Sequence, residues 1–116
     1  MKTNQLTGHA LNWAVSQVEG IDHDTAILNI TIGDDNGWFL DYLTWAQGGP
    51  IIEREKLDVF CSGNVWDAST GDRHPNEIRT GSTPLIAAMR CYVASKLGDE
   101  VEIPTELTQG EASCLI

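Results

Sequence analysis

One segment of this sequence restricts the fold more than any other, because residues 84–97 have the features of a complete helix. Ser82 or Thr83 supplies an N-terminal cap, and Pro84 opens the first turn, where its missing N–H costs no hydrogen bond. Gly98 is a suitable end. One apolar row recurs at helical spacing through Ile86, Met89, Val93 and Leu97. A helix with such a row must bury it, so the rest of the chain has to provide a second layer.

Two further helices are predicted on weaker signals. Residues 7–19 place Leu11, Val15 and Val18 on one side of a helix, with Thr7 as the expected cap. Gly20 follows as a left-handed stop. A short helix is predicted near residues 50–55, with Pro50 at its first position, immediately after Gly48 and Gly49.

Alternating residues predict strands between these helices. Leu28, Ile30 and Ile32 alternate with polar residues over 25–33, and the chain is expected to return over 38–43 through a tight turn at Asn36-Gly37.

A second hairpin is predicted further along the chain. Its strands cover 57–61 and 64–68, with a loop at Ser62-Gly63-Asn64. Residues 69–82 are rich in turn formers and are expected to form a mobile loop. The predicted fold is therefore α+β: a small, mostly antiparallel sheet packed by the 7–19 and 84–97 helices, with the short helix beside it.

The length and charge of the chain limit its function. We expect residues 1–116 to form a single domain, with 105–116 as a loosely packed acidic tail. Seven Lys and Arg against 17 Asp and Glu give a net charge of −10, which disfavours direct binding of nucleic acid or an anionic membrane. No signal peptide or membrane-spanning run is apparent, so we expect a cytoplasmic protein. Its thiols are expected to be free; they are Cys61, Cys91 and Cys114.

The sequence offers little support for catalysis or for a cofactor. No metal-ligand spacing is present among His9, His23 and His74. No nucleophile stands beside a recognisable base, so an enzyme is the less favoured alternative. We therefore expect no cofactor and no catalytic residue.

Two predicted helix starts have the composition of an anion site. They are Gly48-Gly49-Pro50 and Gly81-Ser82-Thr83-Pro84, where glycines let a ligand approach the free backbone N–H groups. Arg54, Arg79 and Arg90 are the cations available to supplement them, and Trp45 offers a stacking surface. An ordinary helix start is the simpler interpretation of either segment taken alone.

Three stretches of the chain resemble a known family: residues 6–15, the run from Trp45-Ala46-Gln47-Gly48-Gly49-Pro50 to Glu55, and the run from Thr83-Pro84-Leu85-Ile86 to Pro104. The chain resembles the NinX-like family of small proteins from tailed phages and prophages. The resemblance implies action in the cytoplasm of the infected bacterium, and it transfers no catalytic residue. The characteristic residues of the family are here Trp45, Gly48, Gly49, Pro50, Glu53, Arg54, Thr83, Pro84 and Arg90.

Two functions are kept as alternatives. The first is a non-catalytic accessory protein that acts in counter-defence and binds a small anionic, nucleotide-like ligand. Its ligand-binding residues would be Trp45, Gly48, Gly49, Arg54, Ser82, Thr83 and Arg90. The second is an acidic decoy or inhibitor that binds a host protein through its negative surface. We also expect a homo-oligomer, because so small a subunit has little room for an enclosed pocket.

Overall fold

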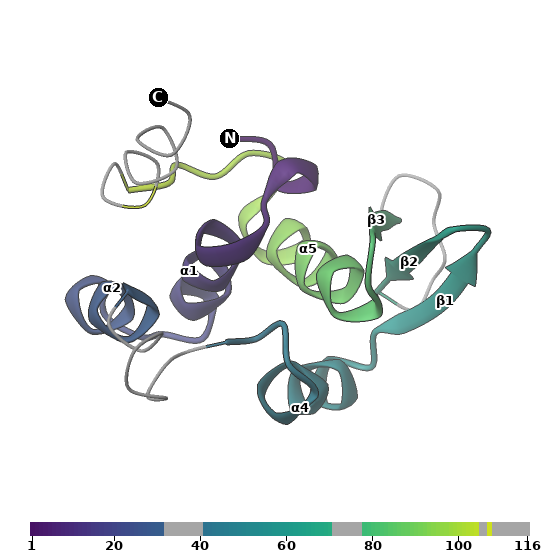
Figure 1. The fold of residues 1–116 in the computed structure, drawn as a ribbon, viewed down its shortest axis with the longest axis horizontal. Coiled ribbons are helices and arrows are strands. Elements are labelled where there is room, and N and C mark those ends of the chain that lie inside the picture. The colour runs from purple at the N-terminus through teal and green to yellow at the C-terminus, as the bar shows by residue number, and fades with distance from the viewer. Residues whose placement is uncertain (32–40, 71–77, 105–106, 108–116) are drawn as a thin grey trace.

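The fold was analysed in a computed structural model of the chain, which describes residues 1–31, 41–70, 78–104 and 107. Figure 1 shows helix α5 (Pro84–Leu97) at the centre, with helices on one side and a small sheet on the other. The predicted α+β class is therefore confirmed, and so are the bounds of the 84–97 helix. The predictions for residues 32–40, 71–77 and the tail beyond 107 lie outside the described residues.

Helix α5 forms as the sequence predicts. The Thr83 hydroxyl accepts a hydrogen bond from Ile86 N (3.1 Å), and Pro84 follows it in the first turn. Both layers pack on this helix, so its buried surface is wider than one row. It comprises Leu85, Ala87, Ala88, Met89, Cys91, Tyr92 and Val93. Leu97, which was predicted to belong to the buried row, is 44% exposed at the end of the helix.

The sheet is antiparallel, with the order β1-β2-β3. Strands β1 (Asp58–Ser62) and β2 (Val65–Ser69) form the predicted hairpin, shifted by one residue from the expected bounds. Its loop has two residues, and Gly63 takes φ 66°, which fits a type II′ turn. Strand β3 (Arg79–Gly81) corrects the prediction that all of 69–82 is a loop, because these residues pair with β2.

Helix α1 (Gly8–Val18) packs against α5, and the short 3-10 helix η1 (Thr3–Gln5) precedes it. The predicted helix at 7–19 is confirmed to within one residue at each end. Thr7 occupies the cap position, but its hydroxyl forms no capping hydrogen bond, which corrects that expectation. Buried Thr3 fixes η1 to the end of α5, because its hydroxyl donates to Gly98 O (2.7 Å).

The strand predicted over 25–33 is wrong over residues 25–31, since these belong to helix α2 (His23–Thr31). Residues 32 and 33 lie outside the described part of the chain. The Asp22 carboxylate accepts hydrogen bonds from Thr25 N (3.0 Å) and from the Thr25 hydroxyl (2.7 Å), which caps the helix. The same hydroxyl contact lowers the pKa of Asp22. Ala26 and Ile30, four residues apart, are buried, whereas Leu28 is 54% exposed. Helical burial therefore explains the apolar residues better than alternation.

The returning strand predicted at 38–43 is also not formed where the structure can test it, because residues 41–43 lead through a turn. Helix α4 (Trp45–Glu55) then begins well before the expected short helix, so Pro50 lies inside it and not at its first position. The turn is fixed by Thr44, whose hydroxyl donates to Asp41 O (2.8 Å), and by Gln47, whose side chain accepts from Asp41 N (3.0 Å). These bonds to Asp41 favour an early start of α4, although its first residues have low helix propensity.

Within the described residues, no helix is both long and apolar enough to cross a bilayer.

Candidate functional site

Helix α4 has two sides with different surroundings. Gly48 and Ile51 face the interior and are buried. Trp45, Pro50 and Glu53 face outward, and Trp45 is 61% exposed although it is the largest apolar side chain of the helix. We call the outward residues Trp45, Ala46, Gly49, Pro50 and Glu53 the outer face of α4. The Trp45 side chain therefore contributes little to the packing of this helix.

The two adjacent glycines of α4 have different roles. A Cβ atom built on Gly48 would lie 2.1 Å from Tyr42 O and 2.6 Å from Leu85 Cδ2, so this position admits no side chain. A Cβ on Gly49 would meet only the Trp45 ring, at 3.7 Å. Gly48 therefore serves close packing. The predicted position of this pair at a helix start is wrong, because both glycines lie within α4 and Gly48 N donates to Thr44 O (2.7 Å). The ligand contact predicted for these glycines stays a prediction.

The close approach of Gly48 and Leu85 brings the two predicted segments together. Leu85 is the second residue of α5, so the start of α5 adjoins the middle of α4. Ser82 and Thr83 are exposed at this start. The Thr83 hydroxyl already accepts the capping bond from Ile86 N, which limits its use toward a ligand.

Arg54 is held in a cluster of side chains that joins α1, α4 and α5. Its Nη1 and Nη2 donate to the two carboxylate oxygens of Glu19 (3.2 and 2.7 Å), and Nη2 also donates to Tyr92 OH (3.0 Å). The Tyr92 hydroxyl donates to Glu19 Oε2 (2.5 Å), and Arg54 Nε donates to Glu55 Oε2 (2.9 Å). We call Glu19, Arg54, Glu55 and Tyr92 the Arg54 cluster.

The charges of this cluster stabilise one another. The bond from Arg54 lowers the pKa of Glu19 and also that of Glu55. Burial, followed by the bond to Glu19, raises the pKa of Tyr92 to about 12. These groups keep their ordinary charge states near pH 7, so the cluster holds three helices together and supplies no group poised for proton transfer.

Arg90 also serves the fold. Its Nε donates to Leu6 O (2.8 Å) and its Nη1 to Thr80 O (2.8 Å), so it links the segment before α1 to strand β3. Burial lowers its pKa. The predicted site thus separates into three places: the α4–α5 contact with Trp45, the Arg54 cluster, and the Arg90 position.

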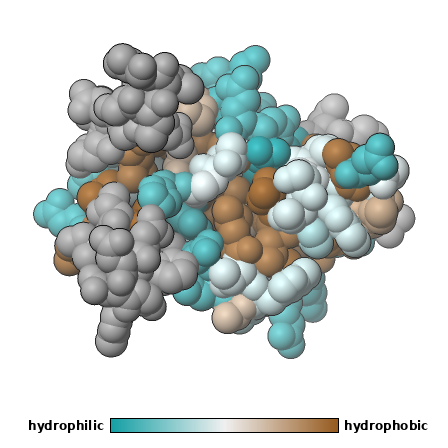
Figure 2. All heavy atoms as spheres, viewed as in Figure 1, coloured by the Kyte–Doolittle hydropathy of each residue, from teal (hydrophilic) through white to brown (hydrophobic). Residues whose placement is uncertain are grey.

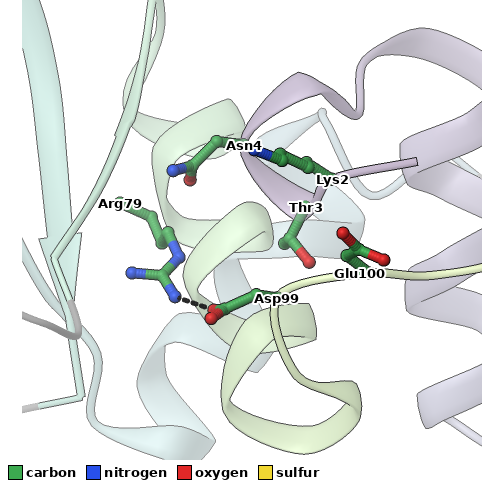
Figure 3. A pocket seen from close by; sticks show the side chains of 6 residues that line it. All are labelled: Lys2, Thr3, Asn4, Arg79, Asp99 and Glu100. Carbon is green, nitrogen blue, oxygen red and sulfur yellow. Dashed lines mark hydrogen bonds and ion pairs between the residues drawn. The ribbon is translucent and has the colours of Figure 1, made fainter.

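A pocket of about 430 Å³ opens elsewhere, between η1, β3 and the segment after α5 (Figure 3). It is lined by Lys2, Thr3, Asn4, Arg79, Asp99 and Glu100. Arg79 extends from β3 toward Asp99, and its Nη2 lies 2.6 Å from Asp99 Oδ1. Two cationic and two acidic side chains line the pocket, so its charge is balanced. Sequence reasoning missed it because its residues are almost 100 positions apart along the chain and share no motif.

The described residues offer few reactive groups. No three or more His, Cys, Asp or Glu side chains among them gather closely enough to hold a metal. Cys91 is buried and Cys61 is exposed, with the Cys61 thiol 3.6 Å from Gly63 O. Figure 2 shows hydrophobic residues gathered over α5 at the centre of the face it draws, with hydrophilic residues around them.

Comparison with known families adds one finding. The family model described as Bacteriophage P22, NinX matches residues 2–96 of the chain. The match covers the described helices and strands except for Leu97, the last residue of α5. The search of curated proteins finds no match.

Proposed function

The chain belongs to the phage NinX family, and on that premise we propose that it binds a basic surface of a host protein through the outer face of α4. Its role would be that of an accessory protein without catalysis, with counter-defence as the expected benefit to the phage. The observation that carries the proposal is the exposure of Trp45. Tryptophan is enriched at the energetic centres of protein interfaces, where a partner covers its large apolar surface.

The neighbours of Trp45 support an interface of this kind. Gly49 and Glu53 follow it at intervals of four residues, so all three lie along one side of the helix. Glu53 adds an exposed carboxylate about two turns further along the same side of the helix. Gly49 bears no side chain where a Cβ would lie 3.7 Å from the Trp45 ring, so it leaves the indole open to a partner.

The distribution of charge supports a basic partner. Among the described residues, three cations form ion pairs: Arg54 with Glu19 and Glu55, Lys96 with Glu55, and Arg79 with Asp99. Arg90 donates to backbone carbonyls. With a net charge of −10, the surface presented to a partner is mainly negative, which favours association with a positive one.

The test is capture of host proteins by the immobilised full chain and by two variants. Trp45→Ala should lose the captured protein, and the affinity of the wild-type chain should fall steeply between low and high salt. The matched control is Leu28→Ala, since Leu28 is a similarly exposed apolar residue (54%) on another helix. Equal capture by the Trp45→Ala and wild-type chains would contradict the proposal.

A small anionic, nucleotide-like ligand is the second candidate, and one observation favours it. Trp45 is the first residue of α4, the end of a helix at which free N–H groups attract negative charge, and the exposed Ser82 and Thr83 adjoin this helix. A base would stack on the indole. Titration with nucleotides should then change the fluorescence of the wild-type chain and leave Trp45→Ala unchanged. Binding of a nucleotide with capture of no protein would favour this candidate over the first.

A further inference from the structure

Strand β1 is an edge of the sheet, and its backbone alternation determines which residues face outward. The two-residue loop makes Ser62 and Val65 a hydrogen-bonded pair, and the register extends this pairing to Phe60–Asp67. Val59 and Cys61 therefore direct their N–H and C=O groups away from β2. In Figure 1, β1 runs along the outer margin of the sheet.

The opposite edge of the sheet is protected. The same alternation turns the backbone groups of Thr80 outward on β3, and there Arg90 Nη1 donates to Thr80 O (2.8 Å). Strand β3 is also only three residues long, with Arg79 at its start. Short length and a basic side chain are the usual means of preventing further strand pairing.

Strand β1 lacks these protections. It contains neither proline nor lysine, and its central residues Val59, Phe60 and Cys61 carry no charge. Within the part of the chain that the structure describes, the outward N–H and C=O groups of Val59 and Cys61 form no hydrogen bond. Val59 packs against the core, which fixes the strand in place. Such an edge is a template for one more strand.

We propose that β1 pairs with β1 of a second copy of this chain, antiparallel about a two-fold axis at Phe60. In this register, the two residues with outward backbone groups face each other across the axis. Val59 of each copy lies opposite Cys61 of the other copy. Four backbone hydrogen bonds result, and two three-stranded sheets become one of six strands.

The side chains at the ends of β1 fit this register. Asp58 lies opposite Ser62 of the second copy, so a hydroxyl faces each carboxylate and no two carboxylates meet. This complementarity favours a second copy over a different chain as the occupant. The surface is separate from the outer face of α4, so the dimer does not depend on the proposed host partner.

The first test is the mass of the full-length chain in solution over a range of concentrations. We expect twice 12.7 kDa for the wild-type chain. Val59→Pro removes an outward N–H without removing a bond to β2, so it should weaken the dimer at least about tenfold, whereas Val59→Ala should leave it intact. High salt should strengthen the dimer, because two chains of the same charge then repel less. Binding of a basic host partner should weaken under the same change.

A cross-link tests the register without relying on a proline. Phe60→Cys, in a chain with Cys61 and Cys114 changed to serine, places two thiols opposite each other at the axis, at a separation of about 4.5 Å between Cα atoms. Oxidation should join the two copies. The control Ser62→Cys should not cross-link, because its two copies lie four residues out of register. A monomeric wild-type chain, a Val59→Pro dimer of unchanged affinity, or equal cross-linking at the two positions would overturn the proposal.

Discussion

The two sides of α4 differ in how closely they pack against the rest of the molecule. On the inner side, Gly48 lies so close to Tyr42 and Leu85 that no side chain fits, and Arg54 at the C-terminal end is held by Glu19 and Tyr92. On the outer side, Trp45 is 61% exposed. The inner residues are therefore explained by the fold, whereas the outer face of α4 has no such explanation. Neighbouring residues of α4 thus have different roles: some are needed for packing and others are not. Substitutions can distinguish the two kinds by their effect on stability.

The largest expected effect is the difference in stability between alanine substitutions of the two glycines of α4. Gly48→Ala places a Cβ 2.1 Å from Tyr42 O, a backbone atom that cannot yield, and should destabilise the chain by about 3 kcal/mol or more. Gly49→Ala should be neutral or stabilise α4 by up to about 1 kcal/mol, because its Cβ would be at ordinary contact distance and alanine favours helix. Chemical denaturation measures both. Similar stabilities for the two variants would show that the two sides of α4 do not differ as described.

The next effect tests whether Arg90 is needed for the stability of the fold or is free for binding. Arg90→Met removes the donors to Leu6 O and Thr80 O and should destabilise the chain by about 2 kcal/mol. Arg90→Lys should recover only part of this loss, because one ammonium cannot reproduce the geometry of the guanidinium. If Arg90→Met were as stable as the wild-type chain, Arg90 would have to be considered as a binding residue instead.

A smaller effect depends on pH and concerns the Arg54 cluster. Glu19→Gln should cost about 1 kcal/mol at pH 7, where the carboxylate accepts bonds from Arg54 and Tyr92. The hydrogen bond from Arg54 lowers the pKa of Glu19 below its ordinary 4.5, so this stabilisation is present above pH 4.5 and is lost as the pH falls through the lowered value. Unfolding curves of both chains at several pH values should therefore converge in acid. A difference that stays constant down to pH 3 would exclude an ionic contribution.

The smallest expected effect on stability belongs to Trp45. Trp45→Ala should change the free energy of unfolding by less than about 0.5 kcal/mol, since the side chain is mostly in solvent. Leu28→Ala should behave similarly. A large loss of stability in Trp45→Ala alone would mean that the indole supports α4, and the outer face would then no longer stand out as a recognition surface.

The elements predicted well are those whose signals are local. The cap at Thr83, the proline at 84 and the glycine at 98 define α5, and the hairpin of β1 and β2 follows from alternation around Gly63. The segment 25–33 was mistaken for a strand because its apolar residues satisfy two periods, and burial of Ala26 and Ile30 against a neighbour decided between them. In the same way, Pro50 suggested a helix start, but the hydrogen bonds of Thr44 and Gln47 to Asp41 accompany a start five residues earlier, at Trp45.

The amino-acid order was enough to predict the α+β class, the central helix, the hairpin, the acidic charge and the resemblance to a phage family, because each depends on neighbouring residues or on composition. Which of the predicted site residues serve the fold depends on contacts between segments far apart in the chain. Arg54 and Arg90 donate hydrogen bonds to residues 35 and 84 positions away. Such distant partners of an arginine cannot be recognised from the residues beside it. Only packing shows that Gly48 is needed for contact while Trp45, three residues earlier, remains in solvent.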